Sequence, residues 1–396
     1  MKKLSVWIAI LIVIVVGVRV NAQKIFSEQM FEYDTSIYLN IPGDKYIEWC
    51  FDNDSCFVYW TDTMLYTLNI YNNNITQTSI KDYIKWAACL AANKDYIVIM
   101  TNDNIWDTIE DAYIFKRQNG KCYYQKTIHI DNVYTADEVY LSRDNKLLLS
   151  DSYLTGSNTN YDNPFTLLLL DIVTGKEIKR IPLPFELPML SYFGPTKVVG
   201  ITDNSIFFSQ KRINKIYEYD YNLDLKDSLV NNNIKWKSYP KDKHDTILKS
   251  YSEVADRAGT MVEDVYKHSM VFTLYPFDNK VLVSYNDRYY KGKRDYFEAS
   301  FDVWERKDDG WQLKINNAHD AMLEKHQKKG QYKRMGDITK EECFCKDGKI
   351  YVLRKGIPLS LNKILSMSKK EYKKLQKEYY SAHSDELFFD VYKIKF

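Results

Sequence analysis

The chain alternates apolar runs with short polar turns in a pattern that repeats six times. Each repeat has a turn of Asp, Asn or Gly residues, and an apolar run follows it at once. The turns begin at Asp52, Asn93, Asp144, Asp203, Asp278 and Asp347, and the runs read CFVYW, YIVIM, KLLLS, SIFFS, KVLVS and KIYVL. Asn, Asp and Gly tolerate positive φ and close tight hairpins, while runs of this composition are typical of β-strands. The pattern therefore predicts an array or a propeller.

Each repeat extends to four strands. One alternating strand precedes the turn, and two more follow the apolar run, joined by a second tight turn; in the third unit these are EVYLS, FTLLLLDI and EIKRIPL. We label the four strands A to D in chain order. The sixth unit ends after ELFFDVYKIKF and lacks strand D, whereas residues 30–41 predict a strand that belongs to no unit. If this N-terminal strand completes the last unit, the ring closes and its sheet edges are protected.

These six units, with phrases such as LLLLDIVTGKEIKRIPL, resemble the secreted TolB-like six-bladed β-propellers over about residues 30–396. The resemblance implies a fold and no particular reaction, because the motifs are structural. The chain has no series of WD dipeptides and no kelch double glycine, and its later units are expanded. A pair of β-sandwiches is the competing fold, but it explains six matching units less well. The predicted fold class is all-β: a six-bladed β-propeller with its N-terminal strand closing the last blade and with helical insertions on one face.

The first 22 residues are typical of a secretory signal peptide. They contain a basic KK start, the apolar run LSVWIAILIVIVV, and the triplet VNA at residues 20–22, which fits a cleavage site. A retained transmembrane anchor is the alternative, since the apolar run is nearly long enough to span a bilayer. Arg19 and the cleavage-like triplet favour removal. No Cys follows the apolar run, so a lipoprotein is not expected. The sequence therefore predicts a secreted or periplasmic protein whose residues 23–396 form the propeller domain.

Composition narrows the classes of partner and of chemistry. The formal net charge is +2, which by itself indicates no polyanion partner, and export disfavours nucleic acid as a partner. The 33 Tyr residues suit strands, or else they stack on a ligand. Six Cys residues permit disulfides after export, and Cys50 and Cys56, which flank the first turn, are the candidate bridge. No zinc spacing, G-x-S-x-G, P-loop or dinucleotide motif is present.

The lengths of the connections predict where binding takes place. In an up-and-down blade the A–B and C–D turns lie on one face, and the B–C and D–A connections lie on the other. Every A–B and C–D turn here is short, so we call their face the trimmed face and the opposite one the elaborated face. The long segments all belong to the elaborated face: residues 102–111, 152–164, 183–196, 231–268, 286–298, 317–342 and 355–385. Long loops on a rigid scaffold are the usual place for binding.

Three insertions on this face are predicted to be helical, at about residues 237–268, 317–342 and 360–382. Residues 245–266 place apolar side chains near the helical period, and Ser368-x-x-Glu371 is a capping box. The last two insertions carry many lysines: Lys325, Lys328, Lys329, Lys333, Lys369, Lys370, Lys373, Lys374 and Lys377. These lysines form either a solvated helix surface or a basic rim that meets an acidic partner or glycan.

Aromatic and acidic side chains in the long segments form the candidate ligand site. They are Trp106, Asp107, Asp111, Tyr153, Tyr161, Tyr192, Tyr289 and Arg294. Aromatic rings stack on the C–H faces of sugars, and carboxylates accept hydrogen bonds from hydroxyl groups; ordinary loop packing is the alternative. Asp107, Glu110 and Asp111 could also supply the paired acids of glycoside hydrolysis, but three acids in one loop indicate this only weakly.

The starts of the A strands surround the predicted axial channel and offer an enzyme hypothesis. Glu138, His268 and Glu342 could converge there on one divalent ion, as in propeller lactonases. They could equally form a salt-bridged plug with Lys85 and Lys197, and the ordinary strand-start context of each acid favours the plug.

The leading prediction is a non-catalytic propeller of the cell envelope that binds a protein or glycan through the elaborated face. The alternative is a metal-assisted hydrolase or lactonase that uses the axial channel, and a third hypothesis is a purely structural subunit of an envelope complex. No cofactor is predicted beyond the divalent metal of the alternative. We expect no nucleic-acid partner and no membrane span after removal of the signal peptide.

Overall fold

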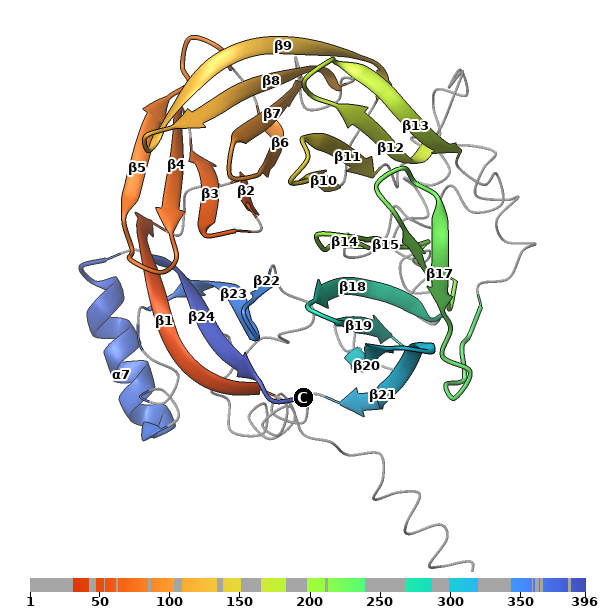
Figure 1. Ribbon diagram of the computed structural model, residues 1–396. Coiled ribbons are helices and arrows are strands. Elements are labelled where there is room, and N and C mark those ends of the chain that lie inside the picture. Colours follow the sequence, from red (N-terminus) through yellow and green to blue (C-terminus); the bar gives the residue numbers. More distant parts are fainter. Residues whose placement is uncertain are drawn as a thin grey trace, which may run out of the picture.

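A computed structural model of the 396-residue chain gives the fold. It describes residues 31–42, 48–52, 54–61, 63–84, 87–102, 109–133, 138–150, 165–182, 198–210, 213–238, 268–286, 299–319, 343–357, 359, 363, 366–383 and 386–396. In these ranges 24 strands form six antiparallel sheets of four strands each. The sheets surround a common axis as the blades of a propeller (Figure 1). The predicted six-bladed β-propeller is therefore confirmed.

Blades 1 to 5 each use four consecutive strands, with the first nearest the axis (Figure 1). Blade 1 contains β2 (Glu48–Phe51), β3 (Cys56–Thr61), β4 (Met64–Asn69) and β5 (Ile75–Ser79), and blade 2 contains β6 (Ala87–Ala92), β7 (Tyr96–Asn102), β8 (Ile109–Gln118) and β9 (Lys121–Val133). Blade 3 contains β10 (Glu138–Leu141), β11 (Lys146–Ser150), β12 (Phe165–Asp171) and β13 (Lys176–Pro182), and blade 4 contains β14 (Val199–Ile201), β15 (Ile206–Ser209), β16 (Ile216–Tyr219) and β17 (Leu225–Leu229). Blade 5 contains β18 (Met270–Phe277), β19 (Lys280–Asn286), β20 (Ala299–Lys307) and β21 (Gly310–His319).

Blade 6 is built from both ends of the chain. Its strands are β22 (Cys343–Lys346), β23 (Lys349–Gly356), β24 (Glu386–Ile394) and, outermost, β1 (Phe31–Pro42). β1 runs antiparallel to β24 from the pair Phe31 and Ile394 to the pair Pro42 and Glu386. The hydroxyl of Ser36 donates a hydrogen bond of 2.7 Å to Oδ1 of the buried Asp390. The expectation that the N-terminal strand closes the last blade is confirmed.

Side chains of the A–B turns explain why these hairpins form. In blade 1, Oδ1 of Asp52 accepts the N–H groups of Asp54, Ser55 and Cys56 at 2.8–3.0 Å. In blade 6, Asp347 and Gly348 both have positive φ, 49° and 66°, as a two-residue hairpin turn requires.

Hydroxyl side chains take over this role in blades 3 and 4. The hydroxyl of Ser142 accepts the N–H of Lys146, and the hydroxyl of Thr202 accepts the N–H of Ser205. These two turns therefore begin one or two residues earlier than the Asx and Gly pattern predicts, because a Ser or Thr hydroxyl replaces the Asx carboxylate or amide.

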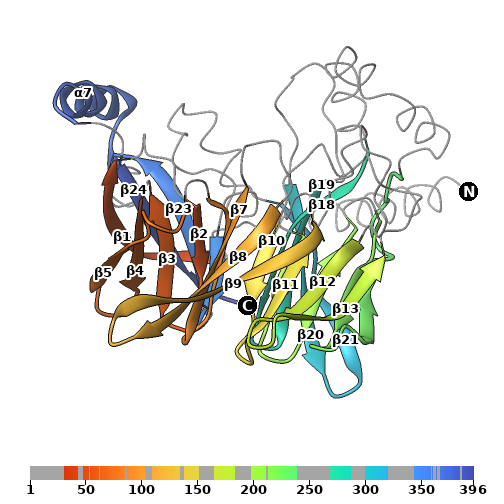
Figure 2. The ribbon, with the colours of Figure 1, turned by 90° about the horizontal axis from the view of Figure 1, so that it is seen from above.

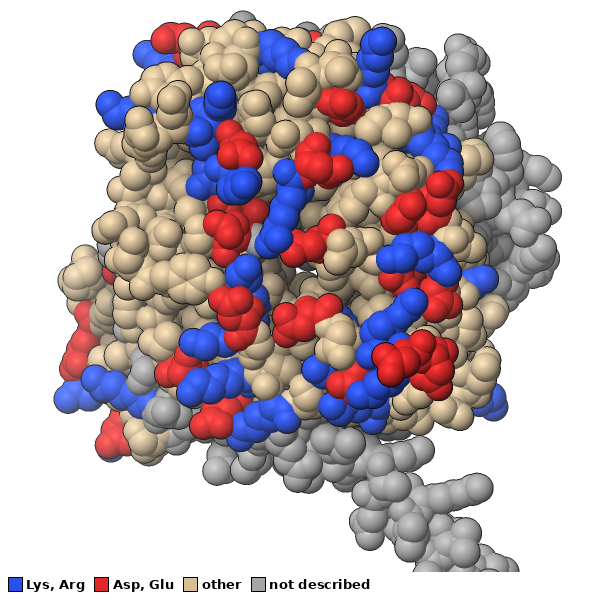
Figure 3. Space-filling model, in the orientation of Figure 1, with Lys and Arg blue, Asp and Glu red and all other residues tan. Residues whose placement is uncertain are grey.

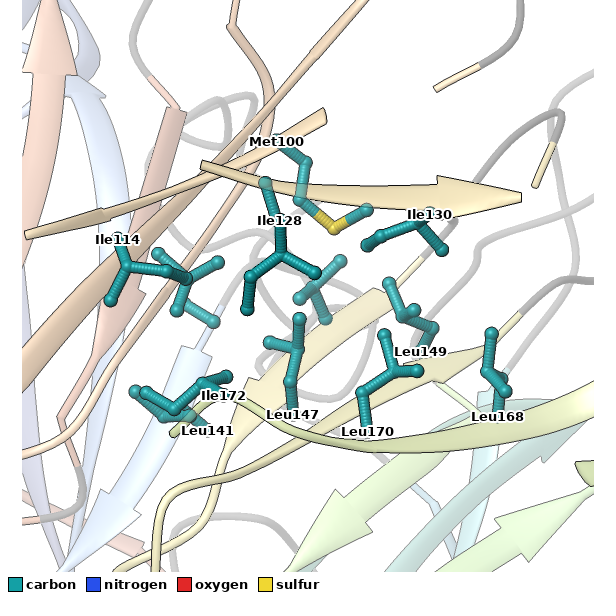
Figure 4. Packing of buried hydrophobic residues seen from close by; sticks show 14 residues of the cluster. Met100, Ile114, Ile128, Ile130, Leu141, Leu147, Leu149, Leu168, Leu170 and Ile172 are labelled. Atoms are coloured by element: carbon teal, nitrogen blue, oxygen red, sulfur yellow. The ribbon is translucent and has the colours of Figure 1, made fainter. Parts of the chain in front are cut away.

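The hydrophobic core is divided among the six interfaces between neighbouring blades. Figure 4 shows the interface of blades 2 and 3, where Met100 and Ile114 face Leu147 and Leu170. A comparable cluster of buried residues lies between each other pair of neighbours. Burying one such aliphatic side chain stabilises the fold by about 1.5–3 kcal/mol. Each blade therefore buries its apolar side chains against both of its neighbours.

One α-helix lies in the described part of the chain, α7 (Lys369–Tyr380). Its capping box is complete: the Ser368 hydroxyl accepts the N–H of Glu371, and the Glu371 carboxylate accepts the N–H of Ser368 at 2.7 Å. The helix predicted after Ser368 is thus confirmed. The other predicted helical insertions lie outside the described residues except at their ends, where residues 317–319 belong to β21. No described helix combines the length and hydropathy that a membrane crossing requires.

None of the six cysteines forms a disulfide in this structure, so the expected bridge between Cys50 and Cys56 is wrong. The register explains the error. Cys50 lies opposite Val58 across the hairpin, and Cys56 lies opposite Asn69 on the next strand. A disulfide requires the two Cβ atoms to approach within about 4.5 Å, which residues offset in this way along neighbouring strands do not achieve.

Candidate functional site

The two faces of the propeller differ in the lengths of their connections. Described strands that are joined at the trimmed face are separated by two to five residues. The connection of residues 278–279 is among the shortest, and that of residues 70–74 is among the longest. At the elaborated face, six connections exceed ten residues: 151–164, 183–198, 230–269, 287–298, 320–342 and 357–385. Figure 2 shows the hairpin turn of β20 and β21 at the lower, trimmed side and α7 at the upper, elaborated side. The asymmetry that the sequence predicted is therefore present in the strand bounds. The predicted long segment 102–111 is an exception, because β7 extends to Asn102 and β8 begins at Ile109, which leaves six residues between them.

Most of the candidate ligand residues lie outside the described residues: Trp106, Asp107, Tyr153, Tyr161, Tyr192, Tyr289 and Arg294. The eighth, Asp111, lies on β8 opposite His129 of β9, and its Oδ1 is 3.2 Å from Nδ1 of His129. Its side chain is 36% exposed, so it remains accessible to a ligand. The aromatic and acidic site stays a prediction.

Glu138, the first residue of β10, fastens blade 3 to blade 4. Its side chain is buried, and its Oε1 accepts the N–H of Val198 at 2.5 Å and that of Val199 at 3.2 Å. Its Oε2 accepts the hydroxyl of Tyr140 at 2.6 Å. Burial and the nearby carboxylate raise the pKa of Tyr140 well above its usual value, so this hydroxyl remains a donor at neutral pH. These contacts hold the start of β14 against the start of β10.

The metal hypothesis depends on residues that the structure describes only in part. His268 lies just before β18 and is half-buried, whereas Glu342 lies outside the described residues. The proposed plug lysines, Lys85 and Lys197, also lie outside them. Among the described residues, no three His, Cys, Asp or Glu side chains form a group that could hold a metal ion. Convergence of Glu138, His268 and Glu342 on a metal stays a prediction.

Charged side chains of both signs are interspersed around the central opening on the trimmed face (Figure 3). Several of them join neighbouring blades. Arg117 of blade 2 donates to Asp52 of blade 1 at 2.5 Å, with 15% and 1% of the two side chains exposed. The guanidinium of Arg306 in blade 5 lies 2.8 Å from the carboxylate of Glu218 in blade 4. The trimmed face thus carries structural cross-links and no concentration of one charge.

The link through Glu218 is protected by its hydrogen bonds. Burial alone would raise the pKa of this carboxyl, but donors from Ser205 and Trp311 and the charge of Lys226 outweigh burial and lower the pKa. The group therefore stays ionised at neutral pH and keeps its contact with Arg306.

The fold and its two unequal faces define a six-bladed β-propeller closed by its N-terminal strand. No family model matches the chain, and no curated protein sequence matches it. Among solved structures, the chain is similar to a "putative exported protein" of Bacteroides fragilis, with a TM-score of 0.55 and 12% sequence identity over 94% of this chain and 97% of that chain. At this identity the similarity shows the fold alone.

Two further solved structures match more weakly. The mitotic checkpoint complex gives a TM-score of 0.41 at 7% identity, covering 88% of this chain and 75% of that chain. Glutaminyl cyclase of Myxococcus xanthus gives 0.30 at 10% identity, covering 48% and 71%. At these scores neither supports a conclusion about this chain.

Proposed function

We propose that this protein is a non-catalytic binding propeller of the cell envelope and that it binds a protein or glycan through its elaborated face. The observation that carries the proposal is the distribution of connection lengths. On that same face, two residues suffice to join β3 and β4, so the fold itself does not require long connections there. Six connections of more than ten residues on one end of a rigid ring are the usual arrangement of a binding face.

The location rests on the N-terminal segment and on one structural similarity. Residues 1–22 have the pattern of a cleaved signal peptide, and the similar Bacteroides fragilis structure, which the chain matches over 97% of that chain, is described as exported. A secreted or periplasmic propeller of the TolB-like kind fits both observations.

The proposal is tested by binding measurements on the purified protein. The panel contains neutral and acidic envelope polysaccharides, peptidoglycan fragments and purified envelope proteins, and affinity is measured by biolayer interferometry. We expect one class of ligand to bind, and Trp106→Ala or Tyr289→Ala to weaken that binding at least tenfold. The matched control is Tyr71→Ala, because Tyr71 is 58% exposed on the trimmed face.

Two results would overturn the proposal. In the first, the protein binds no member of the panel, or Tyr71→Ala weakens binding as much as the changes on the elaborated face. In the second, the protein hydrolyses lactones or esters and loses this activity with EDTA, which would favour the hydrolase alternative.

A further inference from the structure

Helix α7 presents a continuous row of lysines on the elaborated face. Lys370, Lys373, Lys374 and Lys377 are all exposed. At 3.6 residues per turn, they fall within a sector of about 100° around the helix and span about 10 Å along its axis. The helix therefore carries four ammonium groups on one side.

The opposite side of α7 is half-buried and is bonded to blade 6 at one point. Tyr372, Leu375 and Tyr379 are half-buried, and the hydroxyl of Tyr379 donates a hydrogen bond of 3.0 Å to Glu386 at the start of β24. By the same helical geometry, this anchoring side lies roughly 170° from the lysine side. The exposed lysines thus lie on the side of the helix that faces away from this contact.

The positive charge of this row is poorly neutralised. Lys374 lies 3.6 Å from Glu378, but 76% and 61% of these side chains are exposed, and such a pair contributes little. The other three lysines of the row form no ion pair with any residue that the structure describes. Glu371 is engaged in the capping box, where hydrogen bonds from Ser368 lower its pKa. Some lysines elsewhere on the surface have close carboxylate partners, as Lys349 has in Asp34 at 2.7 Å.

We propose that the lysine row of α7 docks a linear acidic polysaccharide. The inference deepens the proposed function and rests on it, since it names the ligand class and one site of the same face. Lysines act as separate point charges without the fork geometry of arginine, so a row of them suits a polymer with repeated sulfate or carboxylate groups. Tyr380, 44% exposed at the end of the helix, offers a ring on which a sugar can stack.

The structure favours this ligand over an anionic membrane. A helix that lies in a membrane interface inserts an apolar side into the lipid. The apolar side chains of α7, Tyr372, Leu375 and Tyr379, are half-buried, and Tyr379 is bonded to Glu386 of blade 6. The polar side has only Tyr380 as a large exposed ring. An acidic peptide would match the charge of the lysines but would make no use of that ring.

The test measures binding of fluorescein-labelled heparin to the purified protein by anisotropy over a series of NaCl concentrations. In the triple variant Lys370→Gln, Lys373→Gln and Lys377→Gln, we expect at least tenfold weaker binding. We also expect the slope of log affinity against log salt to be smaller by about two to three, roughly one for each ammonium group removed from the interface. Gln is a good helix former, so circular dichroism and the melting temperature should not change.

The matched control replaces three exposed lysines of the trimmed face, Lys94→Gln, Lys121→Gln and Lys176→Gln, with the same change in net charge. Its heparin affinity should stay within twofold of the unmodified protein. Tyr380→Ala should weaken binding of heparin but not of polyglutamate.

Several outcomes would overturn the assignment: no heparin binding by the unmodified protein, equal losses in the two triple variants, or tighter α7-dependent binding to polyglutamate or to phosphatidylglycerol vesicles than to heparin. Failure of the assignment is distinguishable from failure of the proposed function. If the panel ligand still binds and remains sensitive to Trp106→Ala while heparin does not bind, only the role of α7 is refuted.

Discussion

Replacing Glu138 tests whether one buried carboxylate joins blades 3 and 4. Its oxygens accept the N–H groups of Val198 and Val199 and the hydroxyl of Tyr140. In Glu138→Gln, the amide oxygen can still face the two backbone donors, while the NH₂ group faces Tyr140, whose hydroxyl can donate to the Val199 carbonyl oxygen 2.8 Å away. The variant therefore keeps its hydrogen-bond partners but not the charge that strengthens these bonds.

The magnitude follows from the number of bonds affected. Hydrogen bonds to charged groups contribute about 1.5–3 kcal/mol and neutral ones about 0.5–1.5 kcal/mol. Glu138→Gln weakens two or three such bonds, and the neutral side chain no longer carries the cost of burying a charge, which offsets part of the loss. The free energy of unfolding should therefore fall by about 2 kcal/mol. Glu138→Ala leaves the donors unsatisfied and should cost about 3–5 kcal/mol. Glu177→Gln is the control, because that carboxylate is 43% exposed in a surface pair with Arg180 and should cost less than about 1 kcal/mol.

Urea unfolding gives the free energies, and thermal unfolding is then repeated with EDTA and with added calcium, zinc or magnesium. We expect the destabilisation by Glu138→Gln to be the same under all these conditions. A metal site filled at a hundred times its dissociation constant would add about 2.7 kcal/mol. If metal raises the midpoint of the unmodified protein and Glu138→Gln abolishes the shift, the carboxylate is a metal ligand and the reasoning is refuted. It is refuted as well if Glu138→Gln is as stable as the unmodified protein.

Two further predictions concern the closing strand. Leu39→Ala should lower the free energy of unfolding by about 3 kcal/mol, because Leu39 is 1% exposed between blades 6 and 1; the adjacent Tyr38→Ala, at 38% exposure, should cost clearly less in the same urea titration. A hydrogen bond from Lys349, together with Lys393, lowers the pKa of Asp34 below its ordinary 3.8. The stability that Asp34 contributes is therefore complete above about pH 4 and is lost as the pH falls through its lowered folded-state pKa. Asp34→Asn should make the free energy of unfolding less dependent on pH in that range, as measured by urea titrations at a series of pH values.

The topology could be predicted because its signals are local. Period-two apolar runs and Asx turns mark each hairpin, and the sixth unit lacks an outer strand while residues 30–41 lack a unit. That count alone indicates ring closure, which the pairing of β1 with β24 confirms. The capping box of α7 is likewise a signal within four residues.

Register and long-range contacts could not be predicted in the same way. Asp52 forms an Asx turn that places four residues, 52–55, between β2 and β3, and this length sets Cys50 opposite Val58 instead of near Cys56. The backbone partners of Glu138, Val198 and Val199, lie about sixty residues later, in the next blade, and no spacing in the sequence marks them. The many lysines of α7 could be counted in the sequence. Which side of the helix faces away from the propeller follows from the contact of Tyr379 with Glu386 in the structure.

Ring closure and binding place opposite demands on the two faces. The bond between Ser36 and Asp390 joins residues 354 positions apart, and contacts of such separation form late because the loop-closure entropy must be met first. Short hairpin turns on the trimmed face lower that cost by letting each blade form locally, and cross-links such as Arg117 to Asp52 then hold neighbouring blades in register. The elaborated face keeps its ring closed despite long connections, three of which join paired strands of one blade: 151–164, 287–298 and 357–385. Each doubling of a flexible loop costs only about 0.6 kcal/mol. The face that carries the long connections is therefore the one on which a binding function can be added without preventing the ring from closing.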